Sequence, residues 1–396
     1  MTALNGVRVL DLGTFIAGPH CATILGEFGA EVIKVEPPKT GDSLRRLGTN
    51  TDCGDTLVWL SEARNKKCVT LNLGSERGRE LLRQLAAKCD IIVENFRPGT
   101  LEKWGLGYNE LKKLNRGAIL VRISAYGQDG PMRTQPGFAR IAHAFSGLTY
   151  LAGLPGGVPV VPGSTSLADY MSGMYGAIGA LVALKAREAT GEGQCVDLAL
   201  YESVFRVLDE IAPAYQKFGY VRERMGADTV NVCPHSHYET KDGKWIAIAC
   251  TSDAMFARLA DVMQQPEVAS AERYGPQVLR LGARDEVNAI VAKWVASLDL
   301  ETVLNRCKDG GVPASLIYSI ADIFEDPQYR ARGNIKMTDS RAGALAVPDV
   351  VPRLSQTPGE IRWLGEGLGS ANDDIYRGLL GLRDDELAQM RDAGVI

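Results

Sequence analysis

Residues 7–36, VRVLDLGTFIAGPHCATILGEFGAEVIKVE, decide the fold class of this chain. Runs of strand-forming residues at 7–12 and 31–36 flank a helical stretch that begins near Pro19 and stops at Gly29. The same alternation continues with strands expected at 68–73, 90–94 and 118–124 and helices at 75–88 and 108–115. Strands that alternate with helices predict an α/β fold with a Rossmann-like, mostly parallel sheet.

The pattern changes near residue 215. A strand at 244–250 follows the Asp242-Gly243 turn, and helices are expected at 253–263, 284–297 and 300–307. We therefore expect a smaller α+β domain over 215–329, with 1–214 and 330–396 together forming the large domain.

Composition excludes several classes of protein. The 44 basic and 48 acidic side chains among 396 residues leave a formal charge of −4, which gives no basic surface for nucleic acid. The eight cysteines include no CxxC pair and predict reduced thiols. No signal segment precedes the first strand, and the apolar stretch 171–184 is short for a membrane span. We expect a cytoplasmic protein without membrane or nucleic-acid partners.

Three local patterns suggest other chemistry but are weak. Glu36 ends the second strand, where an acidic residue could bind a ribose, yet the turn at 13–19 lacks GxGxxG, so an NAD-dependent enzyme is only a minor alternative. Cys233, His235 and His237 alternate as metal ligands could, but no fourth ligand is near, and we interpret them as a turn into the small domain. His20 and Cys21 are adjacent in a helix and do not face each other. We predict no metal site.

Basic residues recur after strands or before helices. They are Lys39, Arg45, Arg46, the run 64–67, Arg97, Lys103 and Arg140. Each alone is typical of a solvated surface. If several meet at the carboxyl ends of parallel strands, they would suit a polyanionic ligand that carries phosphates.

Asp169 lies in Gly163-Ser164-Thr165-Ser166-Leu167-Ala168-Asp169-Tyr170, just before a glycine-spaced helix. One interpretation is a capping box, with Ser166 as the N-cap and Asp169 as its acid. The other is a carboxylate fixed at a helix N-terminus, as a covalent nucleophile requires. Spacing alone leaves both open.

Taken in order, the motifs resemble the class III CoA-transferases of the formyl-CoA transferase and L-carnitine CoA-transferase (CaiB/BaiF) type, over essentially the whole chain. The matching segments are 6–12, 17–19, 25–36, Gly41-Asp42, 64–67, 95–99, 127–131, Ser146-Gly147, 191–194, 311–313 and 393–395. Many ordered matches are more specific than any single motif.

The resemblance implies a fold, a reaction and a set of residues. Asp169 would be the nucleophile, forming aspartyl-anhydride and aspartyl-CoA thioester intermediates. The residues implied for CoA binding are Thr14, Phe15, Lys39, Asn72, Leu73, Asn95, Phe96, Arg97, Lys103, Phe138 and Arg140. CoA and acyl-CoA would be substrates, with no permanently bound cofactor, and the enzyme would be an interlocked homodimer.

Departures from the family pattern narrow the substrate. The glycine run of the formyl-CoA enzyme has no counterpart in the small domain, so oxalate is not the expected acceptor. Ala139 and His143 replace a common acid and a frequent glutamine. The family relation implies transfer from succinyl-CoA to a short dicarboxylate such as malate, citramalate, mesaconate or itaconate.

A buried second carboxylate needs a cation, and the expected partners are Arg140, His143 or one of Arg45 and Arg46, of which Arg46 is preferred. An α-methylacyl-CoA racemase-like enzyme is an alternative, although Phe138 stands where its histidine base would be. A non-catalytic CoA-binding protein is another.

Overall fold

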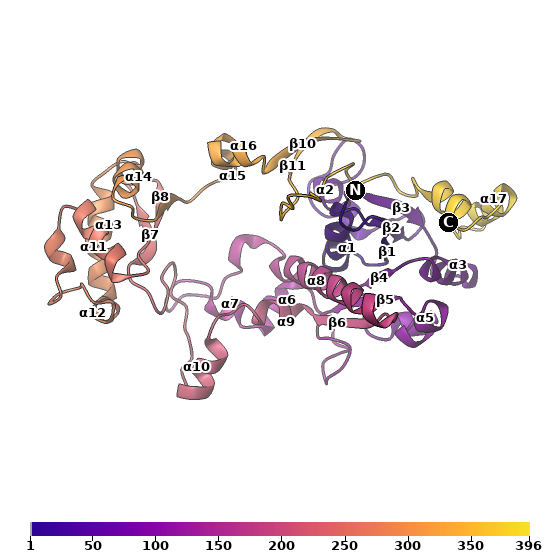
Figure 1. The fold of residues 1–396 in the computed structure, drawn as a ribbon, viewed down its shortest axis with the longest axis horizontal. Helices are drawn as coiled ribbons and strands as arrows, with labels where there is room; N and C mark the ends of the chain where they lie inside the picture. Colours follow the sequence, from indigo (N-terminus) through magenta and orange to yellow (C-terminus); the bar gives the residue numbers. More distant parts are fainter. Residues whose placement is uncertain (1) are drawn as a thin grey trace. The chain divides into compact units, whose positions relative to one another are not determined.

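The centre of the computed structural model, which describes residues 2–396, is a six-stranded sheet in the order β3-β2-β1-β4-β5-β6 (Figure 1). All neighbouring strands are parallel. The strands are β1 Arg8–Asp11, β2 Glu31–Glu36, β3 Lys66–Thr70, β4 Ile91–Glu94, β5 Ile119–Ser124 and β6 Cys195–Ala199. β1 lies between β2 and β4, with Val9 opposite both Val32 and Ile91. The parallel α/β fold expected from the sequence is confirmed.

Alternate residues of each strand face two separate apolar cores, because successive side chains of a strand point to opposite faces. Leu10 and Ile33 lie in one core, whereas Val9 and Val32 lie in the other. The first face is covered by α3 Glu76–Ala87, α4 Thr100–Lys103, α5 Tyr108–Leu114, a π-helical turn Asp374–Leu379 and α17 Asp384–Asp392. The second is covered by α1 Ala17–Glu27, α6 Ala139–Phe145, α8 Leu167–Thr190 and α9 Leu200–Phe205.

Helices α1 and α8 approach each other through glycines. A Cβ on Gly173 would lie 2.9 Å from Cδ2 of His20 and 3.0 Å from the carbonyl oxygen of Ala17. A Cβ on Gly176 would lie 3.2 Å from Sγ of Cys21. By length and composition α8 could cross a membrane, but here its small residues pack against α1 and the sheet.

The chain divides into two compact units. The larger unit comprises the residues up to Leu148, Val161–Glu210 and Arg330–Ile396. The smaller unit comprises Thr149–Val160 and Ile211–Tyr329. The sequence-based border at 214/215 thus lies four residues later than the structural one. The structure also adds 149–160 to the small unit, where Gly226 N–H donates to Gly153 O at 2.9 Å.

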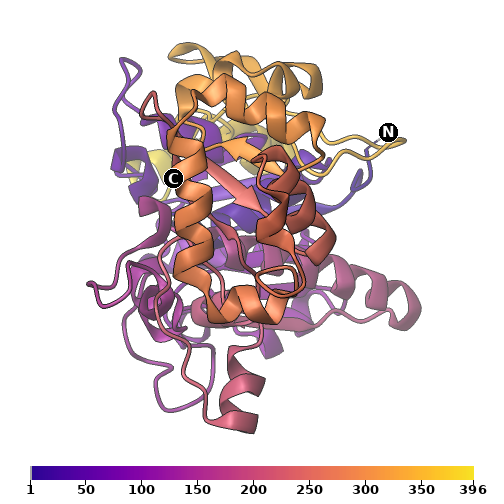
Figure 2. The ribbon, with the colours of Figure 1, turned by 90° about the vertical axis from the view of Figure 1, so that its left-hand side faces the viewer.

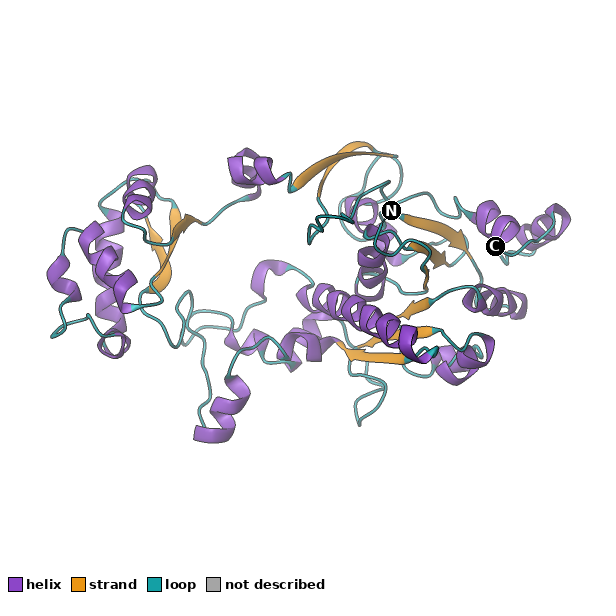
Figure 3. Cartoon of the chain, viewed as in Figure 1, coloured by secondary structure: helices purple, strands orange, loops and turns teal. Residues whose placement is uncertain are grey.

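The small unit contains an antiparallel sheet in the order β7-β8-β9 with helices packed on it (Figures 2 and 3). Its core includes Tyr238, Ile246, Phe256 and Val291. Its elements are α10 Ile211–Phe218, β7 His235–Glu239, β8 Trp245–Ala249, α11 Asp253–Val262, α12 Gln277–Gly282, α13 Arg284–Ala296, α14 Leu300–Asp309, β9 Ala314–Leu316 and α15 Ile320–Glu325. The other elements are α2 Leu57–Glu62, α7 Leu148–Leu151, α16 Pro327–Arg332 and the antiparallel pair β10 Ile335–Ser340 and β11 Gly343–Pro348.

Some boundaries differ from the sequence expectation. Helix α1 begins at Ala17, so Pro19 lies in its first turn, where an N–H has no helical partner to lose. Strand β3 begins at Lys66 rather than Cys68, because pairing with β2 places Lys66 opposite Val32.

Cysteines and histidines outside the proposed site have structural surroundings. All eight cysteines are free. Burial raises the pKa of the Cys21 thiol, and its neighbour His20 contacts Glu62 through Nδ1 at 3.1 Å. Cys233 belongs to the small unit's core, and the residues described here contain no group of three potential metal ligands.

Candidate active site

The candidate site lies at the carboxyl ends of β1 and β4. From β1 the chain continues toward β2, and from β4 toward β5, so the strand order reverses between them. Such a reversal separates the two following turns and leaves a crevice where ligands bind in open α/β sheets. Two cavities, of about 260 and 420 Å³, meet at Thr14 and Phe96 in these turns.

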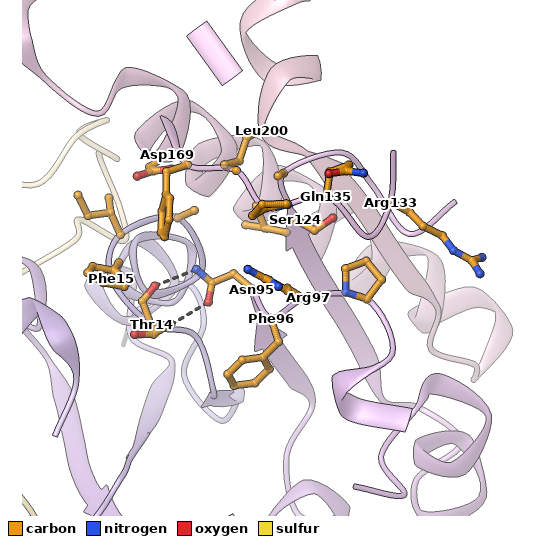
Figure 4. Close-up of a pocket in the computed structure, with 18 residues that line it drawn as sticks. Thr14, Phe15, Asn95, Phe96, Arg97, Ser124, Arg133, Gln135, Asp169 and Leu200 are labelled. Carbon is orange, nitrogen blue, oxygen red and sulfur yellow. Dashed lines mark hydrogen bonds between the residues drawn. The ribbon is translucent and has the colours of Figure 1, made fainter. Parts of the chain in front are cut away.

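The turns after β1 and β4 hold each other by a reciprocal pair of hydrogen bonds (Figure 4). The N–H of Thr14 donates to Oδ1 of Asn95, and Nδ2 of Asn95 donates to the Thr14 carbonyl, both at 2.8 Å. Phe15 has a φ of 61°, in the left-handed region that a bulky side chain rarely adopts. Such strain is retained only where the surroundings enforce it.

A buried charge network beneath the turn supplies that enforcement. The ammonium of Lys34 lies 2.9 Å from Oδ2 of Asp42 and 3.7 Å from Oδ1 of Asp11, and it donates to the Gly13 carbonyl. Oδ1 of Asp42 accepts the Phe15 N–H at 3.1 Å. Burial alone would raise the pKa of Asp42, but Lys34 and backbone N–H donors outweigh it and lower that pKa. The Lys34–Asp42 pair therefore remains charged and holds the turn in place.

Asp169 occupies the first turn of α8 and lines the first cavity with Phe15 and Phe138. Its carboxylate makes no hydrogen bond or ion pair within residues 2–396, and burial raises its pKa to about 6. The group is therefore ionised at neutral pH and has its lone pairs free toward the cavity. This is the state that a carboxylate nucleophile needs.

The capping box expected at Ser166 and Asp169 is formed only in part. Ser166 is the N-cap residue of α8, as expected, but its side chain makes no capping hydrogen bond. The Ala168 N–H instead donates to Nε2 of His143 on α6 at 2.9 Å. The helix start is thus capped from a neighbouring helix rather than by Ser166.

Most residues proposed for the site from the sequence line one of the two cavities. Those on the first are Thr14, Phe15, Asn95, Phe96, Arg97, Phe138 and Asp169. Those on the second are Thr14, Arg46, Asn72, Leu73 and Phe96.

Other proposed residues lie elsewhere. Lys39, Lys103 and Arg140 are exposed and line neither cavity. His143 is 1% exposed and faces the backbone of α8. Burial, with a smaller effect from Arg140, lowers the pKa of His143, which favours the neutral imidazole. The structure therefore does not place His143 or Arg140 where the first cavity would offer them to a substrate carboxylate.

Two further basic positions have structural partners. Arg45 is buried and binds Glu36 through Nε at 2.6 Å and Nη2 at 2.8 Å, and Asp55 at 2.9 Å. Glu36 is thereby occupied and unavailable to a ribose. Lys66 binds Oδ2 of Asp11 at 2.8 Å.

The sequence reasoning missed residues of the loop after β5. Ser124, Arg133 and Gln135 line the first cavity, and in Figure 4 Arg133 lies on the side away from Asp169. The signal that could have found Arg133 is its place between the Gly127–Pro131 motif and Gly137. Leu200, at the start of α9, also lines the cavity.

Comparison with known proteins fits this geometry. The model of CoA-transferase family III matches residues 4–370. The chain belongs to CoA-transferase family III. It is therefore a CoA-transferase, and the resemblance found in its sequence motifs is confirmed.

Relatives of known name support the same class. The chain is 53% identical to both the alpha and the beta subunit of succinyl-CoA--L-malate CoA-transferase from Chloroflexus aurantiacus, covering 99% of this chain and 92% and 98% of those subunits. It is 42% identical to succinyl-CoA--D-citramalate CoA-transferase of the same species, covering 99% of this chain and 98% of that one. The crystal structure of a CAIB/BAIF family protein from Brucella suis matches with a TM-score of 0.84 at 31% identity, over 96% of this chain and 99% of the other.

Proposed function

We propose that this enzyme transfers CoA from succinyl-CoA to a short dicarboxylate of the L-malate or D-citramalate type, with Asp169 as the covalent nucleophile. The observation that carries the proposal is the unpaired, half-buried Asp169 carboxylate facing a cavity at the carboxyl ends of β1 and β4. The names of the relatives support the donor and the acceptor class. Mesaconate and itaconate belong to the same acceptor class.

The reaction proceeds through Asp169 in two halves. Its carboxylate attacks the succinyl thioester carbonyl and CoA thiolate leaves, which gives a mixed anhydride. The thiolate then attacks the Asp169 acyl carbon and releases succinate, leaving an aspartyl-CoA thioester. The acceptor carboxylate displaces CoA to form a second anhydride. CoA thiolate attacks the acceptor acyl carbon, which yields the new acyl-CoA and regenerates Asp169.

CoA would occupy the second cavity and reach Asp169 past Thr14 and Phe96. Arg46 lines the second cavity and Arg97 the first, and guanidinium groups suit phosphate oxygens. Arg97→Ala should weaken CoA binding more at low than at high salt, because exposed ion pairs are screened. Lys185→Ala is the matched control, because Lys185 is exposed on α8, lines neither cavity and is not among the residues proposed for CoA; it should leave CoA affinity unchanged.

The acceptor's second carboxylate would meet Arg133. A dicarboxylate brings a second negative charge that must be compensated when water is removed. Of the arginines on the first cavity, Arg97 is assigned to CoA, which leaves Arg133 for the acceptor. Arg133→Ala should reduce kcat/KM for L-malate more than for butyrate, whereas Arg140→Ala should affect both acceptors equally. Equal losses in Arg133→Ala would remove Arg133 from this role.

The enzyme would act as a homodimer in the cytoplasm. Helix α8 of the large unit exposes Met174, Ile178 and Val182, and α10 of the small unit exposes Tyr215 and Phe218. Clustered apolar side chains exposed on one helix are typical of a protein–protein contact. The equal identity to an alpha and a beta subunit suits a chain that pairs with its own copy. Free cysteines suit a reducing compartment. Sedimentation of the purified chain as a monomer would contradict the dimer.

The deciding experiment combines a substrate panel with one variant. The enzyme is incubated with succinyl-CoA and L-malate, D-citramalate, mesaconate, itaconate, oxalate or butyrate, and the CoA products are identified by mass spectrometry. The CoA thioester of L-malate, D-citramalate, mesaconate or itaconate should form. Asp169→Asn should lose several orders of magnitude in rate while still binding CoA. Hydroxylamine added during turnover should trap the activated Asp169 acyl group.

Other outcomes identify the alternatives. CoA binding without transfer to any acid would indicate a CoA-binding protein. Deuterium uptake at the α-carbon of a 2-methylacyl-CoA in heavy water would indicate a racemase. The aromatic ring of Phe138 offers no base for that reaction.

A further inference from the structure

The N-terminus of α8 depends on a side chain from another helix. The first N–H groups of a helix lack helical partners, and an N-cap side chain usually accepts one of them. Ser166 makes no such bond. Asp169 N–H donates to the Ser166 carbonyl at 2.9 Å, and Ala168 N–H donates to Nε2 of His143 at 2.9 Å.

His143 is built into this contact. It lies on α6, which follows directly from Phe138 on the cavity wall, and its ring is enclosed between α6 and α8. Because Nε2 accepts a hydrogen bond, the proton of the neutral ring is on Nδ1. Nδ1 is buried without a hydrogen-bond partner in the described chain. A buried donor without a partner is costly, so packing alone would favour an apolar residue at this position.

Asp169 has only its backbone to fix its position. Its carboxylate makes no hydrogen bond within the described residues, so neither a cation nor an amide orients it. Its Cα follows Ala168, whose N–H is held by His143. A displacement of about 1 Å in a reacting group can reduce a rate by about 100-fold.

We propose that His143 is a positioning residue for Asp169. Its imidazole caps the first turn of α8 through the Ala168 N–H and thereby holds the Asp169 carboxylate where it can attack the thioester carbonyl. This inference rests on the proposed nucleophilic role of Asp169. His143 does not itself touch the reacting atoms.

Two substitutions separate the cap from packing. His143→Leu keeps a similar volume but removes the acceptor. It leaves the Ala168 N–H unpaired and also removes the unpaired Nδ1 donor, so one unpaired donor replaces another and stability should change little. His143→Gln restores an acceptor oxygen. We expect His143→Leu to lower kcat by about 10- to 100-fold, with KM for succinyl-CoA within about 2-fold of the parent, and His143→Gln to keep kcat within about 3-fold.

The control is a buried contact farther along the same helix. Ser203 of α9 hydrogen-bonds Ser172 of α8 at 2.9 Å, one turn beyond Asp169. Ser203→Ala should lower the melting temperature without lowering kcat. The kcat values are expressed per CoA-binding site titrated, so that unfolded protein does not count, and His143→Met replaces the leucine variant if that variant is insoluble.

The outcomes are decisive for this role. Full kcat in His143→Leu, or an equal loss in His143→Gln, would overturn the positioning role. Failure of the proposed function gives a different result, because Asp169→Asn would then retain transfer activity. If Asp169→Asn is inactive and His143→Leu is unimpaired, only the inference about His143 fails.

Discussion

The replacement of Asp169 by asparagine should stabilise the folded enzyme near neutral pH while it abolishes turnover. Asp169 is an ionised carboxylate that burial deprives of water without giving it a hydrogen-bond partner in the described residues. Asparagine has nearly the same shape and carries no charge. The buried charge of Asp169 therefore lowers the free energy of unfolding, and the neutral asparagine should raise that free energy again.

The magnitude follows from the pKa of Asp169. Burial raises this pKa from its ordinary value of 3.8 to about 6, and each unit corresponds to about 1.4 kcal/mol. The ionised carboxylate thus costs up to about 3 kcal/mol near pH 7.5, from which the favourable helix dipole subtracts about 0.3 to 1 kcal/mol. Because the cavity admits some solvent, we expect Asp169→Asn to gain about 1 to 2 kcal/mol.

The pH dependence has a definite sign. The folded pKa lies above the unfolded one, so the cost is complete above pH 6 and decreases as the pH falls toward 3.8. The advantage of asparagine should therefore shrink by about two-thirds between roughly pH 7.5 and 4.5.

The assay is urea unfolding of the parent and Asp169→Asn at matched protein concentration and at both pH values. Glu76→Gln is the control, because Glu76 is an exposed acid in the first turn of α3. It should lose a few tenths of a kcal/mol at neutral pH through the helix dipole alone. If Asp169→Asn is destabilised like the control, Asp169 serves as a helix-capping acid, and the account of a strained nucleophile is wrong.

Three further outcomes are expected. The kcat/KM of the parent should fall tenfold per pH unit below about pH 6, because Asp169 must be ionised to attack; a profile flat down to pH 4.5 would contradict its raised pKa. Lys34→Met should lower the free energy of unfolding by about 3 to 5 kcal/mol in urea titrations, because it leaves the buried Asp42 carboxylate without its cation, whereas Asp11 keeps Lys66. Asn95→Ala should raise KM for succinyl-CoA by freeing the turn that carries Thr14, and an unchanged KM would show that this turn does not bind CoA.

The secondary structure and the family motifs of this enzyme follow from short segments of its sequence. The alternation of strands and helices over 7–124 defines the doubly wound sheet, because apolar periods of two and 3.6 residues are properties of short segments. The helix stop at Gly29 needs only a positive φ, here 103°. The ordered motifs identify the family, and they mark Asp169 as the residue to test.

The tertiary structure decides which charged residues serve the site. Arg64-Asn65-Lys66-Lys67 is typical of a solvated basic surface in sequence, yet Lys66 is buried and bound to Asp11, which lies 55 residues away. Arg45 likewise serves Glu36 and Asp55, while Arg133 lines the cavity. The charge on these residues is visible in the sequence, but their partners are set by chain crossings that no local pattern encodes.

The capping of α8 shows the same limit most clearly. Ser166 has the residue type and spacing of an N-cap, and local propensity favours its side chain for that role. In the folded chain His143 takes the N–H, because packing of α6 on α8 places an imidazole acceptor 2.9 Å from Ala168. The sequence determines that a helix begins at Leu167 and that the acid Asp169 follows. The contact between α6 and α8 decides what holds that acid in place, because a hydrogen bond depends on distance in space and not on distance along the chain.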